Sequence, residues 1–325
     1  MIRFPICIVL AILSFICPLK AQHFGLSRLF YPNVTIGAEY QSVAKMGNQT
    51  FGTTHTSMLA VVPLRSEVDV TLSLRKKIDL RARHSVLIGN FSQIDPTISD
   101  RPAPKNGYKS AMVGVVMLQA SIRDRLWVYA LGGGLTESNE TFFTPQPYFF
   151  GGAARMRILG ANRQVLYGSA IVYNQKFRII PVLGANIRLN KEWRLSALLP
   201  FRANANYRYN GWLNFDATVA YGGFSAGFQE LKNSETLLRR NNFSEVRFSL
   251  AANANLLTFF NVSVEAGLST FRTLRNLNSS GEILASNTPA ATPFIGATIR
   301  YITSKANAKS AFSNKMGLGG EGTNW

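Results

Sequence analysis

His55 and Ser57 are the residues whose types and spacing could perform catalysis. They stand two positions apart, so on a β-strand their side chains share a face, where a histidine can act as the base for a serine nucleophile. Glu67 or Asp69, on the next predicted strand, could orient the histidine as the third member of a triad. The pattern is only three residues long and arises easily by chance. We therefore expect a polar strand end here and no catalytic residue.

A second serine motif occurs at residues 223–227, where Gly-Phe-Ser-Ala-Gly fits the G-x-S-x-G pattern of a nucleophile elbow. In that fold the catalytic histidine follows the serine, whereas His23, His55 and His84 all precede it. These glycines therefore predict strand or turn positions. No Asp, Glu and His residues have metal-ligand spacing, and no glycine-rich loop could hold a phosphate. We expect neither a metal nor a cofactor.

The chain is strongly basic, with 35 Lys and Arg against 17 Asp and Glu in 325 residues. A charge of this sign favours nucleic acid or anionic lipid as a partner. An export signal at the N-terminus argues against nucleic acid. We expect a basic rim that faces the phosphate groups of outer-membrane lipid and lipopolysaccharide. The sequence does not indicate any protein partner.

The first 21 residues have the pattern of a secretory signal peptide, in which Arg3 precedes a short apolar run that ends near Ala21. No later apolar run approaches the roughly 18 residues that a membrane helix needs. Cys7 and Cys17 both fall within the signal, so we expect no disulfide in the exported chain. Residues 304–325 are polar, basic and Gly-rich, which predicts a flexible tail.

The stretch around Gly211 has the clearest β pattern. Apolar residues alternate with polar or charged ones in both of its arms, so each arm has one apolar and one polar face. Both faces stay uniform only if Tyr207 pairs with Phe215 and Asn206 pairs with Asp216. This register predicts a three-residue loop or a bulge centred on Gly211, and we expect Gly211 to have a positive φ.

Similar alternating segments recur along the chain, and we expect about 12 strands, within a range of 10 to 14. Aromatic residues gather where strands meet turns, as membrane interfaces require. In hydrocarbon a sheet must close on itself to pair every backbone group. Residues 22–303 are therefore predicted to be all-β, a closed antiparallel transmembrane β-barrel with short periplasmic turns and long outer loops. Polar or long loops are expected at residues 45–53, 92–109, 136–147, 231–242 and 270–290.

A resemblance supports this interpretation. The run from Pro181 to Pro200, the alternating region around Tyr207 and the strand from Asn261 to Gly267 resemble a group of uncharacterised outer-membrane β-barrel proteins of Bacteroidota. The similarity covers about residues 180–303. It implies an outer-membrane barrel of unknown role and transfers no functional residue.

Arginines recur on the polar faces of the predicted strands. If they line a lumen, the barrel would favour anions, and if they pair with Asp216, Glu245 and Glu265 they would fill it. The arginines are Arg155, Arg157, Arg188, Arg202, Arg208, Arg247 and Arg300. The candidates for lumen-facing residues are Arg202, Asn204, Asn206, Arg208, Asp216, Arg155 and Arg157.

These features favour a barrel without catalytic activity. We expect either a passive small-solute channel with a preference for anions or a structural or assembly component of the cell envelope. The first alternative is a barrel-type lipid hydrolase that uses His55 and Ser57, as outer-membrane phospholipases and lipid A deacylases use a His-x-Ser pattern. The second is a soluble periplasmic β protein.

Overall fold

The computed structural model describes residues 32–302, except for short stretches at 74–76, 100–106, 122–124, 139–144, 161, 175, 233–234 and 257–258. The expected signal peptide and the expected tail lie outside these residues. Within the described part of the chain every regular element is a β-strand. No helix there is long and apolar enough to cross a membrane.

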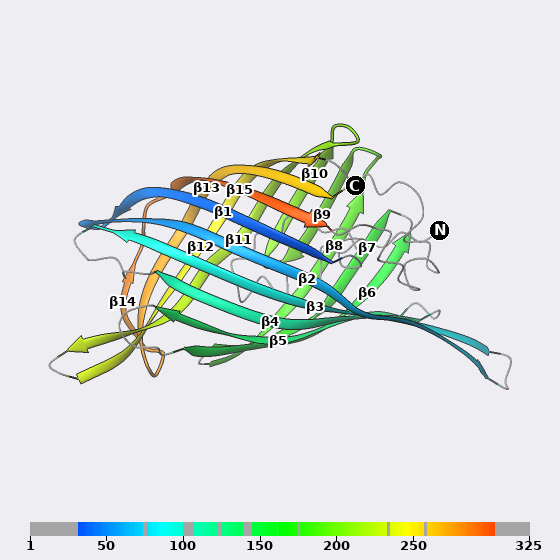
Figure 1. Ribbon diagram of the computed structural model, residues 1–325, viewed down its shortest axis with the longest axis horizontal. Coiled ribbons are helices and arrows are strands. Elements are labelled where there is room, and N and C mark those ends of the chain that lie inside the picture. Colours follow the sequence, from blue (N-terminus) through cyan, green and yellow to red (C-terminus); the bar gives the residue numbers. More distant parts are fainter. Residues whose placement is uncertain are drawn as a thin grey trace.

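The strands follow one another along the chain (Figure 1). They are β1 (Asn33–Met46), β2 (Gln49–Ser73), β3 (Lys77–Ile98), β4 (Tyr108–Ser121), β5 (Arg125–Ser138), β6 (Gln146–Gly160), β7 (Arg163–Asn174), β8 (Lys176–Arg188), β9 (Trp193–Leu199), β10 (Arg202–Arg208), β11 (Leu213–Lys232), β12 (Glu235–Leu256), β13 (Phe260–Asn278), β14 (Ile283–Asn287) and β15 (Thr292–Ile302).

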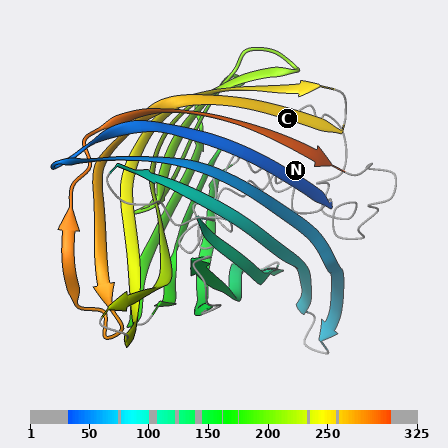
Figure 2. The same ribbon diagram turned by 60° about the vertical axis from the view of Figure 1, so that its left-hand side comes forward.

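Fourteen of these strands form a closed antiparallel barrel. Each strand from β1 to β13 pairs with the next, and β15 closes the ring because it pairs with both β13 and β1. Figure 2 shows β15 lying beside β1. The fifteenth strand, β14, pairs only with β13. The expectation of a closed all-β barrel with 10 to 14 strands is confirmed.

The two ends of the barrel differ. At the end where β1 begins and β15 finishes, here called the terminal end, each connection has four residues or fewer. At the opposite, distal end the longest connections follow β3, β5 and β13. Several expected loops are instead strand, since β1 and β2 turn at residues 47–48 and β13 continues to Asn278. A polar hairpin can continue the backbone pairing beyond the apolar wall. Its residues do not alternate between apolar and polar, so the sequence pattern does not predict a strand there.

The outer surface of the barrel is apolar. On β15, Ile295 and Ile299 are exposed, whereas Phe294 and Arg300 on the opposite face are buried. The same alternation occurs on β13, where Val264 is exposed. Large exposed apolar side chains occur around the ring, among them Ile36, Met58, Val113, Leu131, Ile171, Leu183, Phe215, Leu250, Val264 and Ile299.

Aromatic pairs border this apolar surface at both ends. At the terminal end, ring centroids lie 4.9 Å apart for Trp193 and Tyr207 and 5.3 Å apart for Phe260 and Tyr301. At the distal end, Tyr173 contacts Phe177 at 4.8 Å. An apolar band between two aromatic girdles is the pattern that a bilayer imposes on a barrel.

The inner surface has two halves. On β10 to β13, β15 and β1 the inward side chains are mostly polar. On β3 to β8 they are mostly apolar and form a single buried cluster that extends to β2 and β9. The cluster consists of Leu59, Val61, Ala82, Val86, Ile88, Met112, Val116, Leu118, Val128, Ala130, Tyr148, Phe150, Ala154, Met156, Leu166, Ala170, Val182, Leu198 and Phe201. The inward face is therefore amphipathic around the ring.

The hairpin of β9 and β10 is shorter than its neighbours. Each arm has seven residues, against 13 in β8 and 20 in β11. Pairing of β8 with β9 begins only at Leu183, and pairing of β10 with β11 ends at Ala220. In the part of the chain that the structure describes, no strand therefore lies between the distal parts of β8 and β11.

The hairpin of β10 and β11 has the expected register, with Tyr207 opposite Phe215 and Asn206 opposite Asp216. The expected positive φ at Gly211 is wrong. Instead, the Asn210 Oδ1 atom accepts hydrogen bonds from the backbone N–H groups of Trp212 (3.0 Å) and Leu213 (2.7 Å). This Asx turn reverses the chain without a left-handed residue.

The Asn210 turn can be tested by a pair of substitutions. Asn210→Ala removes the acceptor of two backbone N–H groups, so the free energy of unfolding should fall by about 1 to 2 kcal/mol. Asn210→Asp keeps an acceptor oxygen, so in this variant the free energy of unfolding should fall by less. Urea titration of the refolded barrel measures both, and equal losses for the two variants would contradict this role.

Candidate functional site

Five of the seven candidate lumen residues lie on the inward face of β10 and β11. Asn204 donates to the Thr218 hydroxyl (2.9 Å), and Asn206 donates to Asp216 Oδ1 (2.9 Å). Asn253 on β12 donates to Asp216 Oδ2 (2.7 Å). These contacts form a polar ladder along the wall.

Arginines stand at both ends of that ladder. Arg202 donates to the Thr218 hydroxyl at 3.1 Å, and Arg208 donates from its Nε atom to the carbonyl of Asn210 at 3.4 Å. Both are partly exposed, whereas Asp216 between them is buried. The ladder therefore presents cations and neutral amides to the interior, with its one carboxylate covered.

Arg155 and Arg157 lie elsewhere. Their neighbours on β6, Ala154 and Met156, are buried inward, so the two arginines lie on the outward face. Arg157 is exposed near the terminal end, with its guanidinium 5.9 Å from the ring centroid of Tyr167. The sequence prediction assumed that charge always faces the lumen. On β6 the inward side is apolar, and an arginine near a strand end can reach the polar headgroup zone.

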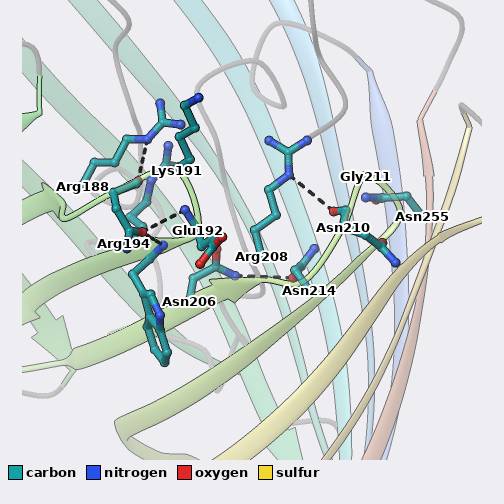
Figure 3. Close-up of a pocket in the computed structure, with 12 residues that line it drawn as sticks. Arg188, Lys191, Glu192, Arg194, Asn206, Arg208, Asn210, Gly211, Asn214 and Asn255 are labelled. Atoms are coloured by element: carbon teal, nitrogen blue, oxygen red, sulfur yellow. Dashed lines mark hydrogen bonds between the residues drawn. The ribbon is translucent and has the colours of Figure 1, made fainter.

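A small basic pocket lies at the terminal end of the same strands (Figure 3). It has a volume of about 50 Å³, which suits a few waters or a small anion. Its charged lining residues are Arg188, Lys191, Arg194, Arg208 and Glu192. Asn206 and Asn214 also line the pocket, so it adjoins the polar ladder.

The charges in this pocket are unbalanced. Arg188 on β8 is directly opposite Arg194 on β9 in the strand register. Like charges directly opposite each other destabilise a sheet. Glu192 is the one acid in the lining. An arrangement of four cations around one anion is suited to attract a further anion.

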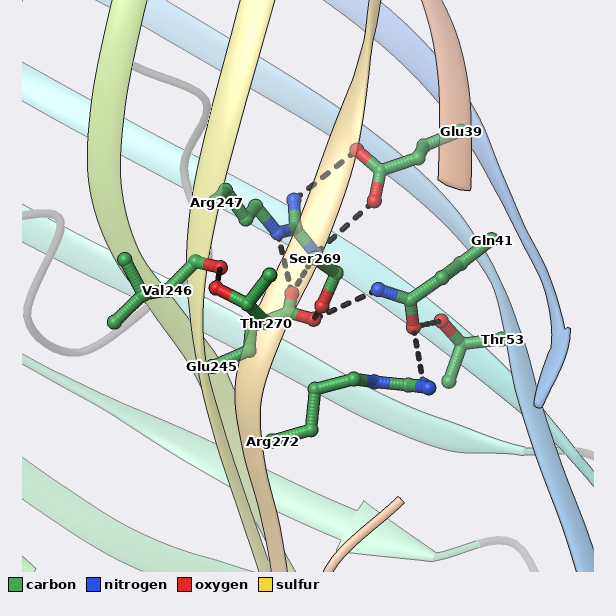
Figure 4. A network of polar contacts seen from close by, with 9 residues as sticks. All are labelled: Glu39, Gln41, Thr53, Glu245, Val246, Arg247, Ser269, Thr270 and Arg272. Atoms are coloured by element: carbon green, nitrogen blue, oxygen red, sulfur yellow. Dashed lines mark hydrogen bonds and ion pairs between the residues drawn. The ribbon is translucent and has the colours of Figure 1, made fainter. Parts of the chain in front are cut away.

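A second polar cluster lies across the seam where the barrel closes (Figure 4). Arg247 on β12 binds both carboxylate oxygens of Glu39 on β1, at 3.0 and 3.1 Å, and it also pairs with Glu245. Glu39 and Glu245 are buried. The pair with Glu39 connects two strands through residues that are 208 positions apart in sequence.

Neutral side chains complete this seam cluster. Gln41 donates to Glu245 Oε2 at 2.7 Å, and the hydroxyl of Ser269 donates to the same oxygen. Thr53 donates to Gln41 Oε1 at 3.0 Å. Arg272 donates to that oxygen as well, at 2.9 Å. Two arginines and two carboxylates thus neutralise one another formally.

A row of four aromatic rings in contact with one another crosses the distal mouth. Phe224 on β11 contacts Tyr108 on β4, with ring centroids 5.2 Å apart, and contacts Phe243 on β12 at 5.4 Å. Phe243 contacts Phe51 on β2 at 5.1 Å. The guanidinium of Arg272 lies over Phe51 at 5.2 Å and joins this row to the seam cluster. We call these four rings the mouth ladder.

Polar contacts reinforce the mouth ladder. Asn241 donates to the hydroxyl of Tyr108 at 2.5 Å, and Arg240 donates to Ser225 at 3.3 Å and to Gln146 on β6. The distal part of β11 contacts β5, which stands nearly opposite it in the ring of strands. The distal ends of β11 and β12 therefore cross the lumen instead of continuing the wall.

A glycine permits this departure of β11. Gly223 has a φ of 149°, and a Cβ atom there would lie 2.1 Å from the carbonyl oxygen of Phe243. Gly223 lies two residues beyond Tyr221. The N–H of Tyr221 donates to the carbonyl of Phe201, in the turn between β9 and β10, at 2.8 Å, and this is the last hydrogen bond of β11 to that hairpin. The G-x-S-x-G motif is thus a strand segment, as expected, and the backbone conformation at position 223 explains why a glycine occupies it.

The carboxylates expected to complete a triad with His55 and Ser57 do not reach them, and the carboxylate opposite His55 in the strand register is Glu39, which binds Arg247. His55 is buried on β2, and Ile94 of β3 lies opposite it. Glu67 lies twelve residues further along the same strand, at a distance of about 40 Å along β2. Its carboxylate pairs with Arg65. Asp69 lies further still on β2. No group of three potential metal-ligand side chains occurs among the described residues.

Glu39, Gln41 and Arg272 escaped the sequence prediction. Gln41 and Arg272 lie outside the predicted strands, in or beside segments that were expected to be loops or connections. Glu39 lies in a predicted strand, but its partner Arg247 is remote in sequence. The interpretation that some arginines pair with acids holds for Arg247 and Glu245.

No family model and no curated protein sequence matches the chain. Among solved structures, it is similar to the COG4313 outer membrane channel from Pseudomonas putida F1, with 7% identity, a TM-score of 0.43, and coverage of 84% of this chain and 96% of that one. It is also similar to the transport unit of the autotransporter AIDA-I from Escherichia coli, with 9% identity, a TM-score of 0.33, and coverage of 91% and 95%.

A mutant of the Rh. blastica porin matches with 8% identity, a TM-score of 0.31, and coverage of 84% of this chain and 99% of that one. At such identities and scores these similarities carry no inference about function. The barrel itself is established by the strand pairing.

The seam cluster predicts a large effect of Arg247→Met. The change leaves Glu39 and Glu245 buried without their main partner, so the free energy of unfolding should fall by about 3 to 5 kcal/mol. Arg65→Met removes an exposed ion pair with Glu67 and should change the free energy of unfolding by less than about 1 kcal/mol. Urea midpoints of the refolded variants test this, and similar midpoints would argue against a structural role for the seam cluster.

Proposed function

We propose that the protein is a non-catalytic barrel of the outer membrane that conducts small solutes and favours anions. The observation that carries this proposal is the basic pocket at the terminal end, where Arg188 lies opposite Arg194 and Arg208 adjoins the polar ladder. Cations that line a pore enrich anions and lower the barrier to their passage.

The outer surface supports a membrane location. Exposed apolar side chains surround the ring, and aromatic pairs border them at both ends. A closed barrel leaves no lipid-facing sheet edge where each strand has two neighbours. Short connections at the terminal end fit the periplasmic side of such a barrel, and longer distal connections fit its outer side.

The number of strands supports a lumen. Eight strands leave an interior that side chains just fill, whereas barrels of 16 to 18 strands enclose aqueous channels. A ring of 14 lies between these cases. The polar ladder supplies one wetted wall, and the mouth ladder narrows the distal end. We therefore propose a restricted channel rather than a wide pore.

The positions of the carboxylates around His55 in the described strands support a role without catalysis. Neither Glu67 nor Asp69 can reach His55, because both lie further along the same strand. Ser225 of the second motif accepts a hydrogen bond from Arg240. A barrel-type hydrolase would need a carboxylate that orients His55. Glu39 lies opposite His55 in the strand register, but both of its oxygens bind Arg247.

Conductance in planar bilayers tests the anion preference. The double variant Arg188→Gln and Arg194→Gln should lower the anion-to-cation permeability ratio by roughly half or more, because it removes two pocket cations. Arg163→Gln changes an exposed arginine at the same end but outside the pocket, and it should leave the ratio unchanged. An unchanged ratio in the double variant would count against the proposal.

The mouth ladder narrows the distal end, so its removal should raise conductance. Phe243→Ala removes the ring that contacts both Phe224 and Phe51, so single-channel conductance should rise by at least about twofold. Phe271→Ala deletes a ring that is 78% exposed and should have no effect. If both the original barrel and Phe243→Ala are silent in bilayers, the barrel is a structural component of the envelope and not a channel.

A further inference from the structure

The barrel wall is incomplete on the distal side of the β9 and β10 hairpin. Among the described residues, nothing pairs with β8 from Lys176 to Val182 or with β11 from Gly222 to Lys232 on the sides that face each other. Two strand positions are missing there. At about 4.8 Å per strand this gap is at least about 10 Å wide, and the turn of β11 into the lumen at Gly223 widens it.

This opening faces the apolar surroundings of the barrel. Phe177 and Ile179, on the outward face of β8 beside the opening, are 76% and 74% exposed. Phe177 contacts Tyr173 in the distal aromatic girdle. Further along the same face, Leu183 begins the part of β8 that β9 covers. The opening therefore lies between the distal girdle and the end of the short hairpin, within the apolar band.

The edge of β8 at the opening is accessible from both sides. Lys176, Phe177, Arg178 and Ile179 are all exposed, whereas alternating burial starts again at Val182. In hydrocarbon, an unpaired backbone N–H or C=O group is unfavourable by several kcal/mol. Water from the lumen or a polar group of a ligand can satisfy these edges.

The route along the barrel axis is obstructed above the opening. β11 turns into the lumen at Gly223, and the mouth ladder joins it to β2 and β4. The same departure of β11 that closes the mouth leaves the opening in the wall. A molecule inside the barrel below the mouth ladder therefore meets a lateral exit.

The chemistry around the opening fits an amphiphile. Lys176 and Arg178 share the inward face of β8 at its edge, where they can hold an anionic head group. Beside the opening, the outer wall has an apolar hollow of about 810 Å³. Small and large apolar side chains line it, among them Ala197, Ala203, Ala205, Ala217, Phe248, Leu250 and Leu268.

We infer that this opening is a lateral port that passes a single-chain alkyl carboxylate between the barrel interior and the membrane. The inference rests on the proposed location in the outer membrane and names a solute class for the channel. The carboxylate matches Lys176 and Arg178, and the alkyl chain matches the hollow.

Photolabelling in nanodiscs of uncharged phosphatidylcholine tests the port. The probe is palmitate with a photoreactive diazirine near the end of its chain, mapped by mass spectrometry with and without excess palmitate. Labelling that excess palmitate suppresses should concentrate on residues 176–183 and on the hollow. Ala205→Trp fills the hollow and should abolish that labelling. The double variant Lys176→Gln and Arg178→Gln should raise the half-saturating concentration about tenfold.

The chain offers matched controls. A second apolar hollow of about 470 Å³, lined by Ala60 and Ala111 among others, lies on the outer wall away from the opening. Ala111→Trp fills that hollow and should leave labelling at the port unchanged. Arg275→Gln removes an exposed distal cation of β13 and should leave the half-saturating concentration unchanged.

Three results would overturn the port. Labelling could spread evenly over lipid-facing positions such as Ile36 and Ile299 without suppression by palmitate. Ala111→Trp could reduce labelling as much as Ala205→Trp. Phosphatidylglycerol could compete as well as palmitate, which would refute a single-chain solute. A barrel that keeps its anion preference in planar bilayers but gives one of these results refutes the port alone. A chain that does not insert into nanodiscs refutes the proposed function as well.

Discussion

Closure of the ring is the constraint on which the rest of the structure depends. A sheet of 14 strands has no exposed edge only if β15 pairs with both β13 and β1. The buried ion pair of Arg247 on β12 with Glu39 on β1 lies across this seam, and Glu245 on β12 also pairs with Arg247. Ions in a low-dielectric interior need good geometry and further hydrogen bonds, which Gln41 and Ser269 provide. The seam is thus specified by partners remote in sequence and not by the pairing of strands alone.

One short hairpin explains two features at the distal end. Because β9 and β10 have seven residues each, β11 loses its neighbour beyond Ala220. A strand without a neighbour on one side can leave the wall, and Gly223 supplies the backbone conformation for it. The departing strand places Phe224 across the mouth, and its absence from the wall leaves the lateral opening. A closed mouth and an open side are therefore one structural event.

The two halves of the inner surface give the barrel a chemical asymmetry. A water-filled pore usually has a polar lining throughout, but here the inward faces of β3 to β8 are apolar. The polar ladder lies on the other half, on β10 to β12, and the basic pocket adjoins it at the terminal ends of β8 to β10. An interior with one apolar and one cationic wall suits solutes that have both characters. The proposed channel and the proposed port follow from the same asymmetry.

Much of the fold follows from local alternation. Period-two patterns identified the outward face of β15 and the register of β10 with β11, because a shift by one residue would reverse the faces of a strand. The polar extensions of the strands were not predicted. Both faces of a hairpin beyond the apolar band are polar, so its sequence does not alternate between apolar and polar residues. Gly211 was assigned a positive φ from its type, whereas the Asn210 side chain performs the turn.

The sequence by itself determined the all-β class, the approximate number of strands and the apolar outward faces, since each of these depends on neighbours a few residues apart. Only the tertiary structure decided which polar residues meet. Arg155 and Arg202 have the same local pattern, yet one faces outward from an apolar wall and the other faces a polar ladder. The seam cluster, the mouth ladder and the lateral opening depend on strands that only ring closure brings together. The contacts of an inward side chain depend on residues across the barrel that are distant in sequence, and a local pattern holds no information about them.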